Sequence, residues 1–418
     1  MQFAPAAAPP ARRPDPETGR KITGAVLYAL GMLGGGLLLL LVFIIPAFLS
    51  KESSAELGAM LTGALYALPP LVVYLWIPWI VDRYDPEPWW CLLLALAWGG
   101  IAACGFSALI NTAVHLTGNA IGGKSFGNLL GACVSAPLVE EFFKGLAVFG
   151  MFFFLRRQFD GVVDGVIYAT FAALGFAAVE NIIYYSQAAR EGGDALLGTV
   201  VVRGILGPWG HPLYTSMTGL GFGISRETNK TWLKWLAPVG GYMFAAFLHS
   251  VWNLAATLSN LLVLVMLPLW FLFVIGFFVL VIWLVKRKGK IIRDHLRDEV
   301  LMGNLTPWEL DLITSPVGRI KATFSYGGAA GRKLIDAAAR LALSKWHTGR
   351  ATQGRKMTVS SDMILPLRQD IFRLRAEVSK AMGKQVQQPQ VWTPPVAGAN
   401  QQPIQQQPQQ GGPHQYRR

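Results

Sequence analysis

The chain has 418 residues, of which 52% are apolar and only 15% are charged. Soluble domains usually carry about a quarter charged residues, so this composition argues against a soluble protein. The net charge of +13 lies in one part of the chain, because residues 286–418 hold 22 basic and 9 acidic residues and residues 1–285 hold 15 of each. A neutral apolar region followed by a basic tail is typical of a membrane protein with a cytosolic end, and we expect no nucleic-acid partner.

Residues 1–21 are rich in Pro and Ala and are expected to form a disordered cytosolic N-terminus. A membrane-spanning helix needs about 20 mostly apolar residues. Residues 22–285 contain eight such stretches, at roughly 22–49, 57–81, 90–113, 126–155, 164–187, 195–224, 233–258 and 260–285. The predicted fold class is therefore all-α, a polytopic helical membrane protein with about eight transmembrane helices and a C-terminal cytosolic tail.

Basic residues in alternate loops predict the direction of the spans. Arg20 and Lys21 precede the first stretch, Arg156 and Arg157 follow the fourth, and three basic residues at 286–288 follow the last. The positive-inside rule then puts both termini in the cytosol, and an even number of spans agrees. We find no internal repeat, which argues against a transporter built from inverted halves.

The tail divides into two parts. Residues 286–385 are expected to form a basic cytosolic helical segment. In "LTPWELDL", Thr306 is suited to an N-cap, Pro307 to the first helical position and Glu309 to a capping box. "MILPLRQDIFRLRAEVSKAM" contains a second amphipathic helix. Residues 386–418 are Gln/Pro-rich and are expected to be disordered.

Apart from the ends of the apolar stretches, ionisable residues inside them are few, and each is costly. A charge at the bilayer centre costs at least ~2.5 kcal/mol, even on the scale that penalises it least. These residues occupy four neighbouring stretches and are Glu140, Glu141, Lys144, Glu180, Arg203, His211 and His249, with the polar Asn253 one turn after His249. By the predicted topology, they lie between the midplane and the outer leaflet. This agreement in depth favours one polar cavity over a set of unrelated structural salt bridges.

The adjacent pair Glu140 and Glu141 is suited to acid–base chemistry. Two carboxylates at low dielectric cannot both ionise easily, so one is expected to hold a proton, while Lys144 favours the ionised form of the other. One acid and one base are what hydrolysis by activated water requires. His249 and Asn253 lie one turn apart on one helix face, where they can orient water or stabilise an oxyanion.

Four motifs in this order carry a family resemblance: "EEFFK", "GFAAVENIIYY", "GHPLYTSMTGLGFG" and "HSVWN". Together with "VDRYDPEPWW", they make residues 70–260 resemble the PrsW family of intramembrane proteases, which is related to the CAAX-prenyl endopeptidases and the CPBP group. The resemblance implies that Glu140 and Glu141 are the catalytic pair, that His211 and His249 are further site residues and that Asn253 is an oxyanion donor. Glu180 stands where the wider group often has histidine, which leaves its role open.

The resemblance leaves the use of a metal open. PrsW proteins have been grouped with metalloproteases, but this chain has no H-E-x-x-H motif. If a metal is present, His211, His249 and Glu141 are the expected ligands and zinc the expected ion. A metal-free mechanism, in which the glutamate pair activates water, is the alternative.

The hypothesis from the sequence is an intramembrane protease that hydrolyses peptide bonds of membrane-anchored proteins. The expected partners are the lipid bilayer and a single-span substrate, such as an anti-sigma factor or a similar regulator. The expected location is a bacterial plasma membrane, with both termini cytosolic. Two alternatives remain: a transporter or channel that uses the same polar groups, and a non-catalytic membrane scaffold.

Overall fold

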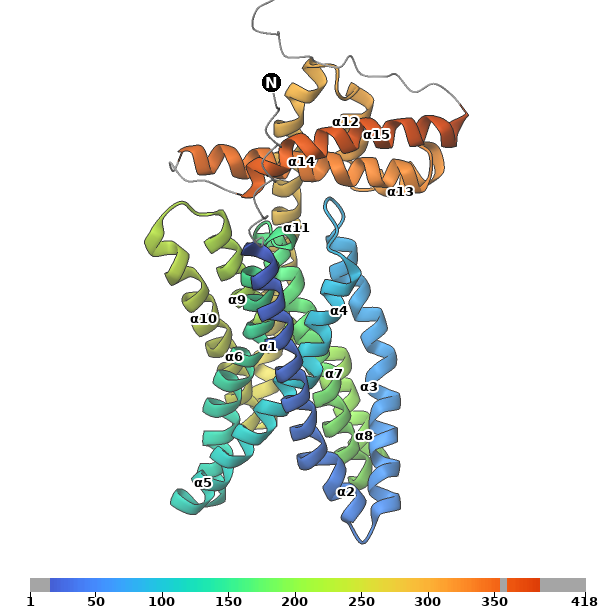
Figure 1. Ribbon diagram of the computed structural model, residues 1–418. Coiled ribbons are helices and arrows are strands. Elements are labelled where there is room, and N and C mark those ends of the chain that lie inside the picture. The colour runs from blue at the N-terminus through green and yellow to red at the C-terminus, as the bar shows by residue number, and fades with distance from the viewer. Residues whose placement is uncertain (1–15, 354–358, 384–418) are drawn as a thin grey trace, which may run out of the picture.

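The computed structural model describes residues 16–353 and 359–383, and these form helices joined by short loops, with no strand among them. Figure 1 shows long helices side by side in a bundle, with a layer of shorter helices across one end. The all-α fold class is confirmed. Residues 16–21, expected to be disordered, are helical because α1 begins at Pro16, a residue compatible with the first helical position. The rest of that segment and the Gln/Pro-rich residues 386–418 lie outside the described residues.

The bundle consists of α-helices interrupted by short π-helical segments (η). Its elements are α1 (Pro16–Leu39), η1 (Leu40–Ile44), α2 (Ile45–Leu49), α3 (Ser53–Val81), α4 (Trp89–Ala97), η2 (Trp98–Ala103), α5 (Cys104–Leu130), η3 (Gly131–Ser135), α6 (Ala136–Phe154), the 3-10 turn η4 (Arg156–Gln158), α7 (Val162–Glu191), α8 (Gly193–Val200), η5 (Val201–Leu206), α9 (Gly210–Glu227), α10 (Thr231–Leu258) and α11 (Asn260–Leu301). Helix α7 lies at the centre, where most of its residues are buried.

The expected number of eight spans is not confirmed. Five helical stretches among the described residues are long and apolar enough to cross a membrane: Thr18–Leu49, Ser53–Val81, Trp89–Phe154, Val162–Glu191 and Leu261–Leu301. The third turns back on itself at Gly123, whose φ of 79° is in the left-handed region that glycine adopts readily. The expected span 195–224 is not one helix, because the helical structure is interrupted at residues 207–209, between η5 and α9.

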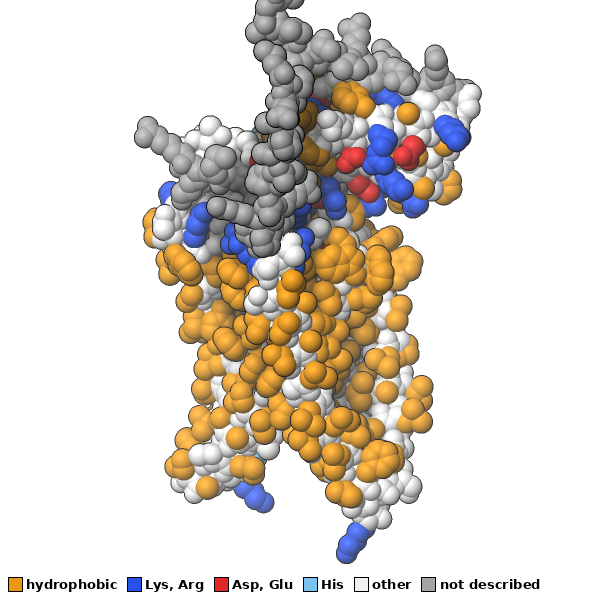
Figure 2. Space-filling model, in the orientation of Figure 1, with side chains coloured by type: hydrophobic (Ala, Val, Ile, Leu, Met, Phe, Trp, Pro, Cys, Tyr) orange, Lys and Arg blue, Asp and Glu red, His pale blue; other side chains and the backbone are white. Residues whose placement is uncertain are grey.

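The outer surface of the bundle is apolar, as a lipid-facing surface requires. Figure 2 shows hydrophobic side chains over the whole length of the bundle, with Lys and Arg gathered at its ends. Large apolar side chains on α1, α3, α10 and α11 are exposed, among them Leu33, Leu65, Trp235 and Leu272. In water this surface would favour aggregation, whereas in a bilayer it is matched by acyl chains.

The C-terminal layer consists of α12 (Pro307–Ile313), α13 (Gly318–Ser325), α14 (Ala329–Gln353), the 3-10 turn η6 (Val359–Met363) and α15 (Ile364–Met382). The capping box expected at the start of α12 is present, because Thr306 and Glu309 bond to each other's backbone N–H groups. The two expected helices are α12 and α15, whereas α13 and α14 were not expected.

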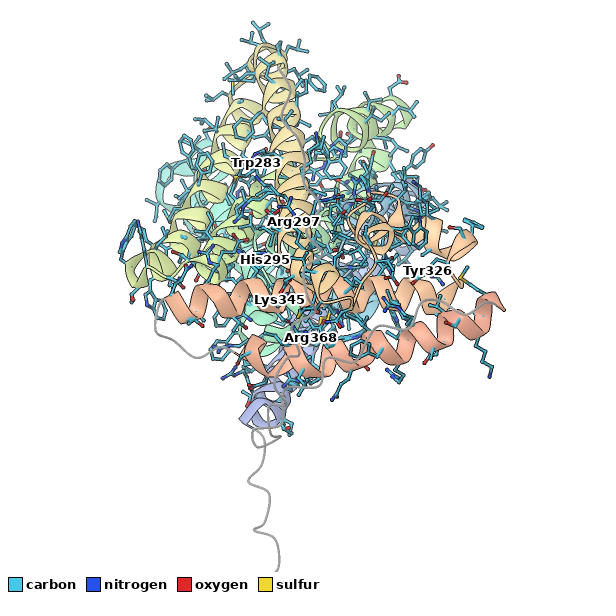
Figure 3. The ribbon with its side chains drawn as sticks, turned by 90° about the horizontal axis from the view of Figure 1, so that it is seen from above. Trp283, His295, Arg297, Tyr326, Lys345 and Arg368 are labelled. Atoms are coloured by element: carbon cyan, nitrogen blue, oxygen red, sulfur yellow. The ribbon has the colours of Figure 1, made fainter. Side chains whose placement is uncertain are left out.

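Buried ion pairs join this layer to α11, which runs from the bundle past the expected boundary at residue 285. Glu299 of α11 accepts hydrogen bonds from Lys345 of α14 at 3.0 Å and from Arg368 of α15 at 2.6 Å. Figure 3, which looks onto the layer, shows Lys345 and Arg368 beside α11. Within the layer, the buried side chain of Arg375 donates to Glu309 at 2.7 Å. The basic segment is therefore a packed unit held to the bundle by α11.

Candidate functional site

The polar cluster inside the bundle is centred on the N-terminal half of α6. Glu140, Glu141 and Lys144 lie within about one turn of this helix, so their side chains share a face, and all three are buried. Lys144 Nζ lies 2.6 Å from Glu141 Oε1 and 3.9 Å from Glu140 Oε2. The ammonium group therefore pairs closely with one carboxylate and only loosely with the other.

Glu141 is held at both oxygens. Thr215 Oγ1 on α9 donates to Oε2 at 2.7 Å, and His249 Nδ1 on α10 donates to Oε1 at 3.1 Å. Because Nδ1 of His249 is used in this way, the second ring nitrogen, Nε2, is turned toward Glu140 Oε2 at 4.0 Å. A carboxylate that fixes a histidine ring through Nδ1 is a common arrangement behind reactive or metal-binding histidines.

Glu140 has one oxygen bound and one free. Asn111 Nδ2 on α5 donates to Oε1 at 3.2 Å, and Ser135 Oγ in turn donates to Asn111 Oδ1 at 2.8 Å. Oε2 is buried and has no hydrogen-bond partner among the described residues. Burying an acceptor without a partner costs about 1–3 kcal/mol, so this oxygen points to a water, a metal ion or a substrate group that completes the site.

His211 lies at the start of α9, directly after the loop at residues 207–209 that interrupts the helix. Its Nε2 donates to Glu180 Oε2 on α7 at 2.9 Å, and its Nδ1 accepts from Lys144 Nζ at 3.0 Å. Glu180 also pairs with Arg203 of η5, whose Nε donates to Asn181 at 2.8 Å. A broken helix at membrane depth is tolerated where the irregular backbone lines a cavity, and Gly207 and Pro208 do line one.

That cavity has a volume of about 740 Å³, within the range of small-molecule and active-site pockets. It is lined by Glu140, Glu180, Arg203, His211, His249 and Asn253. It extends along α8 to the turn between α10 and α11, at the end of the bundle away from the C-terminal layer (Figure 1). Of the six site residues predicted from the sequence, Glu140, Glu180, His211, His249 and Asn253 therefore border this cavity. The sixth, Glu141, is next to Glu140 on α6 but does not line the cavity.

Glu140, His211 and His249 could hold a metal ion if His211 exchanged one of its two contacts, since its ring nitrogens bond to Glu180 and Lys144. One ligand atom from each of Glu140, His211 and His249 lies within 4.8 Å of the others. Two histidines and a glutamate form a donor set typical of catalytic zinc, which leaves a position open for water or substrate. The free oxygen of Glu140 faces the free nitrogen of His249, as such a set requires. The sequence named Glu141 as the acidic ligand, but both Glu141 oxygens are bound by other side chains.

Some site residues have a place that the sequence did not predict. Asn253 lines the cavity, but its Nδ2 donates to the backbone oxygen of Ala132 at 2.9 Å. Thr215 and Asn111, which bind the two glutamates, were not identified. The position of Thr215 one turn after His211 is a signal that could have indicated it. Asn111 lies in an apolar stretch with no motif around it.

Residues 87–284, which contain every residue of the cluster, match the family described as PrsW family intramembrane metalloprotease. A protein of Geobacillus kaustophilus named Protease PrsW is 31% identical over 29% of this chain and 50% of its own length. The proteins of the same name from Halalkalibacterium halodurans and Bacillus subtilis are 30% and 27% identical, over 37% and 51% of this chain and 64% and 87% of their own lengths.

The chain thus spans about half the length of the first of these relatives. No solved structure matches it significantly. The family match and the relatives agree with the resemblance drawn from the four motifs, and they cover the part of the chain that holds the buried glutamates and histidines. Residues 87–284 of this chain are therefore similar to the PrsW family of intramembrane metalloproteases.

Proposed function

We propose that this protein is an intramembrane endopeptidase that hydrolyses peptide bonds of membrane-anchored proteins. One observation carries the proposal: in the segment that matches the PrsW family, a buried glutamate oxygen without a hydrogen-bond partner lies 4.0 Å from a histidine nitrogen in the wall of a cavity. A set of structural salt bridges would be expected to pair all its charged atoms. The free Oε2 of Glu140 instead suits a group that accepts a proton.

In the proposed reaction, Glu140 Oε2 accepts a proton from a water molecule whose oxygen bonds to the carbonyl carbon of the substrate. The C–N bond then breaks, and the proton passes to the leaving amine nitrogen. Glu141, which is held by Lys144 and Thr215, positions His249. Asn253 has a second N–H that the bond to Ala132 does not use, and this N–H can stabilise the oxyanion.

In an alternative, metal-assisted mechanism, Glu140, His211 and His249 would hold a zinc ion that supplies Lewis acidity at the scissile carbonyl, and Glu140 would then be a ligand and not the base. The donor set and the family description support this ion. In either mechanism Glu141 orients His249 through the bond to Nδ1. Lys144 would have to give up its contact with His211 if Nδ1 of that ring became the ligand.

The proposed substrate is a single-span membrane protein, such as an anti-sigma factor or a similar regulator, because the cavity lies within the bundle. We place the protein in a bacterial plasma membrane with the C-terminal layer in the cytosol. Arg20 and Lys21 in the first turns of α1, and the basic residues 286–288 of α11, support this orientation. The relatives named Protease PrsW come from Bacillus and related organisms, which supports the location.

Cleavage by variants of the glutamate pair tests the proposal. A purified single-span candidate is incubated with the protein in lipid vesicles, and products are detected by mass spectrometry. Glu140→Gln should abolish cleavage, because glutamine keeps the shape of the side chain but cannot take a proton. Glu141→Gln should abolish cleavage because a neutral amide cannot pair with Lys144 and hold His249 in the same way. Glu56→Gln, a partly exposed position on α3, is the matched control and should cleave normally. Near-normal cleavage by both site variants would refute the mechanism.

Metal content is a separate test with a readout besides activity. The metal-assisted mechanism predicts about one zinc ion per chain in the purified protein, measured by elemental mass spectrometry. His249→Ala and Glu140→Gln should lose the ion, because each removes one ligand. His295→Ala on α11, outside the cluster, should keep it. A zinc-free wild-type protein that cleaves at full rate would favour the metal-free glutamate mechanism.

A further inference from the structure

A second cavity, of about 480 Å³, lies between α1, α4 and α6 and shares no lining residue with the first. Its walls come from the start of α1, the start of α4 with η2, and the end of α6. It therefore lies at the end of the bundle next to the C-terminal layer (Figure 1). Leu27, Trp90 and Phe149 line it and are 50%, 40% and 39% exposed. The cavity thus opens onto the surface of the bundle that faces lipid.

The walls are almost wholly apolar. The hydroxyl of Tyr28, one of the few polar groups there, is engaged because it donates to the backbone oxygen of Leu94 at 3.2 Å. Walls of leucine, tryptophan and phenylalanine offer an occupant dispersion contacts but no hydrogen bonds. The volume lies within the ~300–1,000 Å³ of sites that bind small molecules. An acyl chain is an occupant of this size and polarity that the surrounding bilayer supplies.

The mouth of the cavity is basic. Lys21 lines it, and the neighbouring Arg20 places its guanidinium 5.5 Å from the ring of Phe153. The guanidinium of Arg156 lies over the same ring at 5.6 Å. Among the described residues, no carboxylate forms an ion pair with Arg20 or Lys21. These basic side chains lie in the first turns of α1, beside an apolar cavity. This arrangement is complementary in charge and polarity to a lipid, whose head-group phosphate lies above its acyl chains.

We propose that this cavity binds one anionic phospholipid. An acyl chain occupies the space between α1, α4 and α6, and the head-group phosphate lies against Lys21 and Arg20. The charge of the mouth selects an anionic head group over a zwitterionic one. A lipid here would join the first helix of the chain to α6, the helix that carries Glu140 and Glu141. The proposal does not depend on the proposed protease activity.

Native mass spectrometry of the full chain tests the proposal. The purified protein is given equal amounts of a phosphatidylglycerol and a phosphatidylcholine of the same acyl chains. The wild type should retain the phosphatidylglycerol preferentially. Lys21→Ala should weaken its binding about fivefold, as expected for the loss of ~1 kcal/mol from one basic residue, with little effect on phosphatidylcholine. Lys51→Ala, at the exposed turn after α2, is the matched control and should leave both unchanged.

A second variant fills the cavity. A Cβ at Gly150, which lines the cavity, would meet no atom within 4 Å, so Gly150→Leu places a side chain where the acyl chain is proposed to lie. This variant should lose the retained lipid of either class. Gly276→Leu on α11, which is equally open but outside the cavity, should keep it. Equal retention of both lipids by the wild type, or unchanged retention by Gly150→Leu, would overturn the proposal and would favour another occupant, such as the chain's own residues 1–15.

Discussion

At the scale of single residues, Lys144 links the two halves of the polar cluster. Its ammonium group has three N–H donors, and it contacts Glu141 at 2.6 Å, His211 at 3.0 Å and, more distantly, Glu140. Its charge also lies 4.4 Å from the ring centre of Phe176, which adds a cation–π contact. A buried lysine with these partners holds Glu141 in place, and at 3.9 Å it is too far from Glu140 Oε2 to donate a hydrogen bond to it.

Thr215 should act as a positioning residue. Its hydroxyl donates to Glu141 at 2.7 Å, and Glu141 in turn fixes the ring of His249. We expect Thr215→Val, which keeps the shape but removes the donor, to lower cleavage by about 10–100-fold, as is typical for groups behind a metal or catalytic histidine. Thr215→Ser should restore most of the rate.

The measurements are the cleavage rate and the zinc content of each variant in the same lipid. A structural role alone would predict that Val and Ser lower the thermal stability without changing metal content or rate. Full activity of a folded Thr215→Val protein would show that the bond to Glu141 is dispensable.

At the scale of the elements, glycine decides how closely the helices approach. Gly99 in η2 lies against the backbone of Ala172 in α7, so a Cβ there would overlap the Ala172 carbonyl oxygen. Gly165 of α7 and Gly219 of α9 meet in the same way. Small residues at crossings of this kind let membrane helices pack backbone to backbone. These contacts bring η2, α7 and α9 close together, so that Glu180 of α7 and His211 of α9 can meet.

Gly99→Ala should therefore destabilise the bundle by about 1–3 kcal/mol or more, because the obstructing atom is backbone and cannot turn away. Gly58→Ala is the matched control. It also lies in a helix, α3, but its Cβ would meet open space, so the change should be neutral or slightly stabilising. Thermal unfolding in detergent measures both. Equal melting temperatures for the two variants would contradict the close crossing of η2 and α7.

At the scale of the whole molecule, an ion pair on a buried carboxylate joins the bundle to the C-terminal layer. Arg340 of α14 donates to Asp85, in the loop after α3, at 3.2 Å. Within the bundle, Lys288 of α11 donates to Asp164 of α7 at 2.8 Å. Asp82 lies in the same loop as Asp85 and is 3% exposed, and its Oδ1 has no hydrogen-bond partner among the described residues. Burial raises the pKa of Asp82 to about 8, although Lys288 opposes this shift.

The stability of this junction should depend on pH. Because the pKa of Asp82 is higher in the folded protein than its ordinary value of 3.8, the folded state binds the proton more tightly. The resulting stabilisation is complete below about pH 4 and is lost as the pH rises toward about 8. The melting temperature should fall between about pH 4 and pH 8, and Asp82→Asn should flatten that fall. Asp311→Asn, an exposed position, is the control. An unchanged slope in Asp82→Asn would show that this carboxyl is not responsible.

The site cavity should open on the side of the membrane away from the C-terminal layer. It extends to Thr199 on α8 and Ala256 on α10. Single cysteines at these positions, in a background lacking Cys91, Cys104 and Cys133, should react with a membrane-impermeant thiol reagent added outside intact cells. A cysteine at Phe153, near the opposite end of α6, should stay unlabelled. Labelling only from the cytosolic side would reverse the proposed orientation.

The sequence by itself determined the helical membrane class, the family resemblance and the residues of the polar cluster. These follow from local properties: the length of each apolar stretch, and the cost of each charge placed within it. Glu140, Glu141, Glu180, His211 and His249 were predicted because their charge or polarity conflicts with the apolar residues around them. Thr215 and Asn111 do not stand out in this way, because uncharged polar residues are common in membrane helices.

Only the tertiary structure decided what each residue contacts. Thr215 and His249, which form hydrogen bonds with Glu141, lie 74 and 108 positions away from it in the sequence. Asn111, which donates to Glu140, lies 29 positions away. No local pattern shows which glutamate those partners bind and which keeps a free oxygen. The break before α9 and the second cavity likewise arise where separate helices meet. The contacts between helices, which depend on backbone approach at positions such as Gly99, set these features.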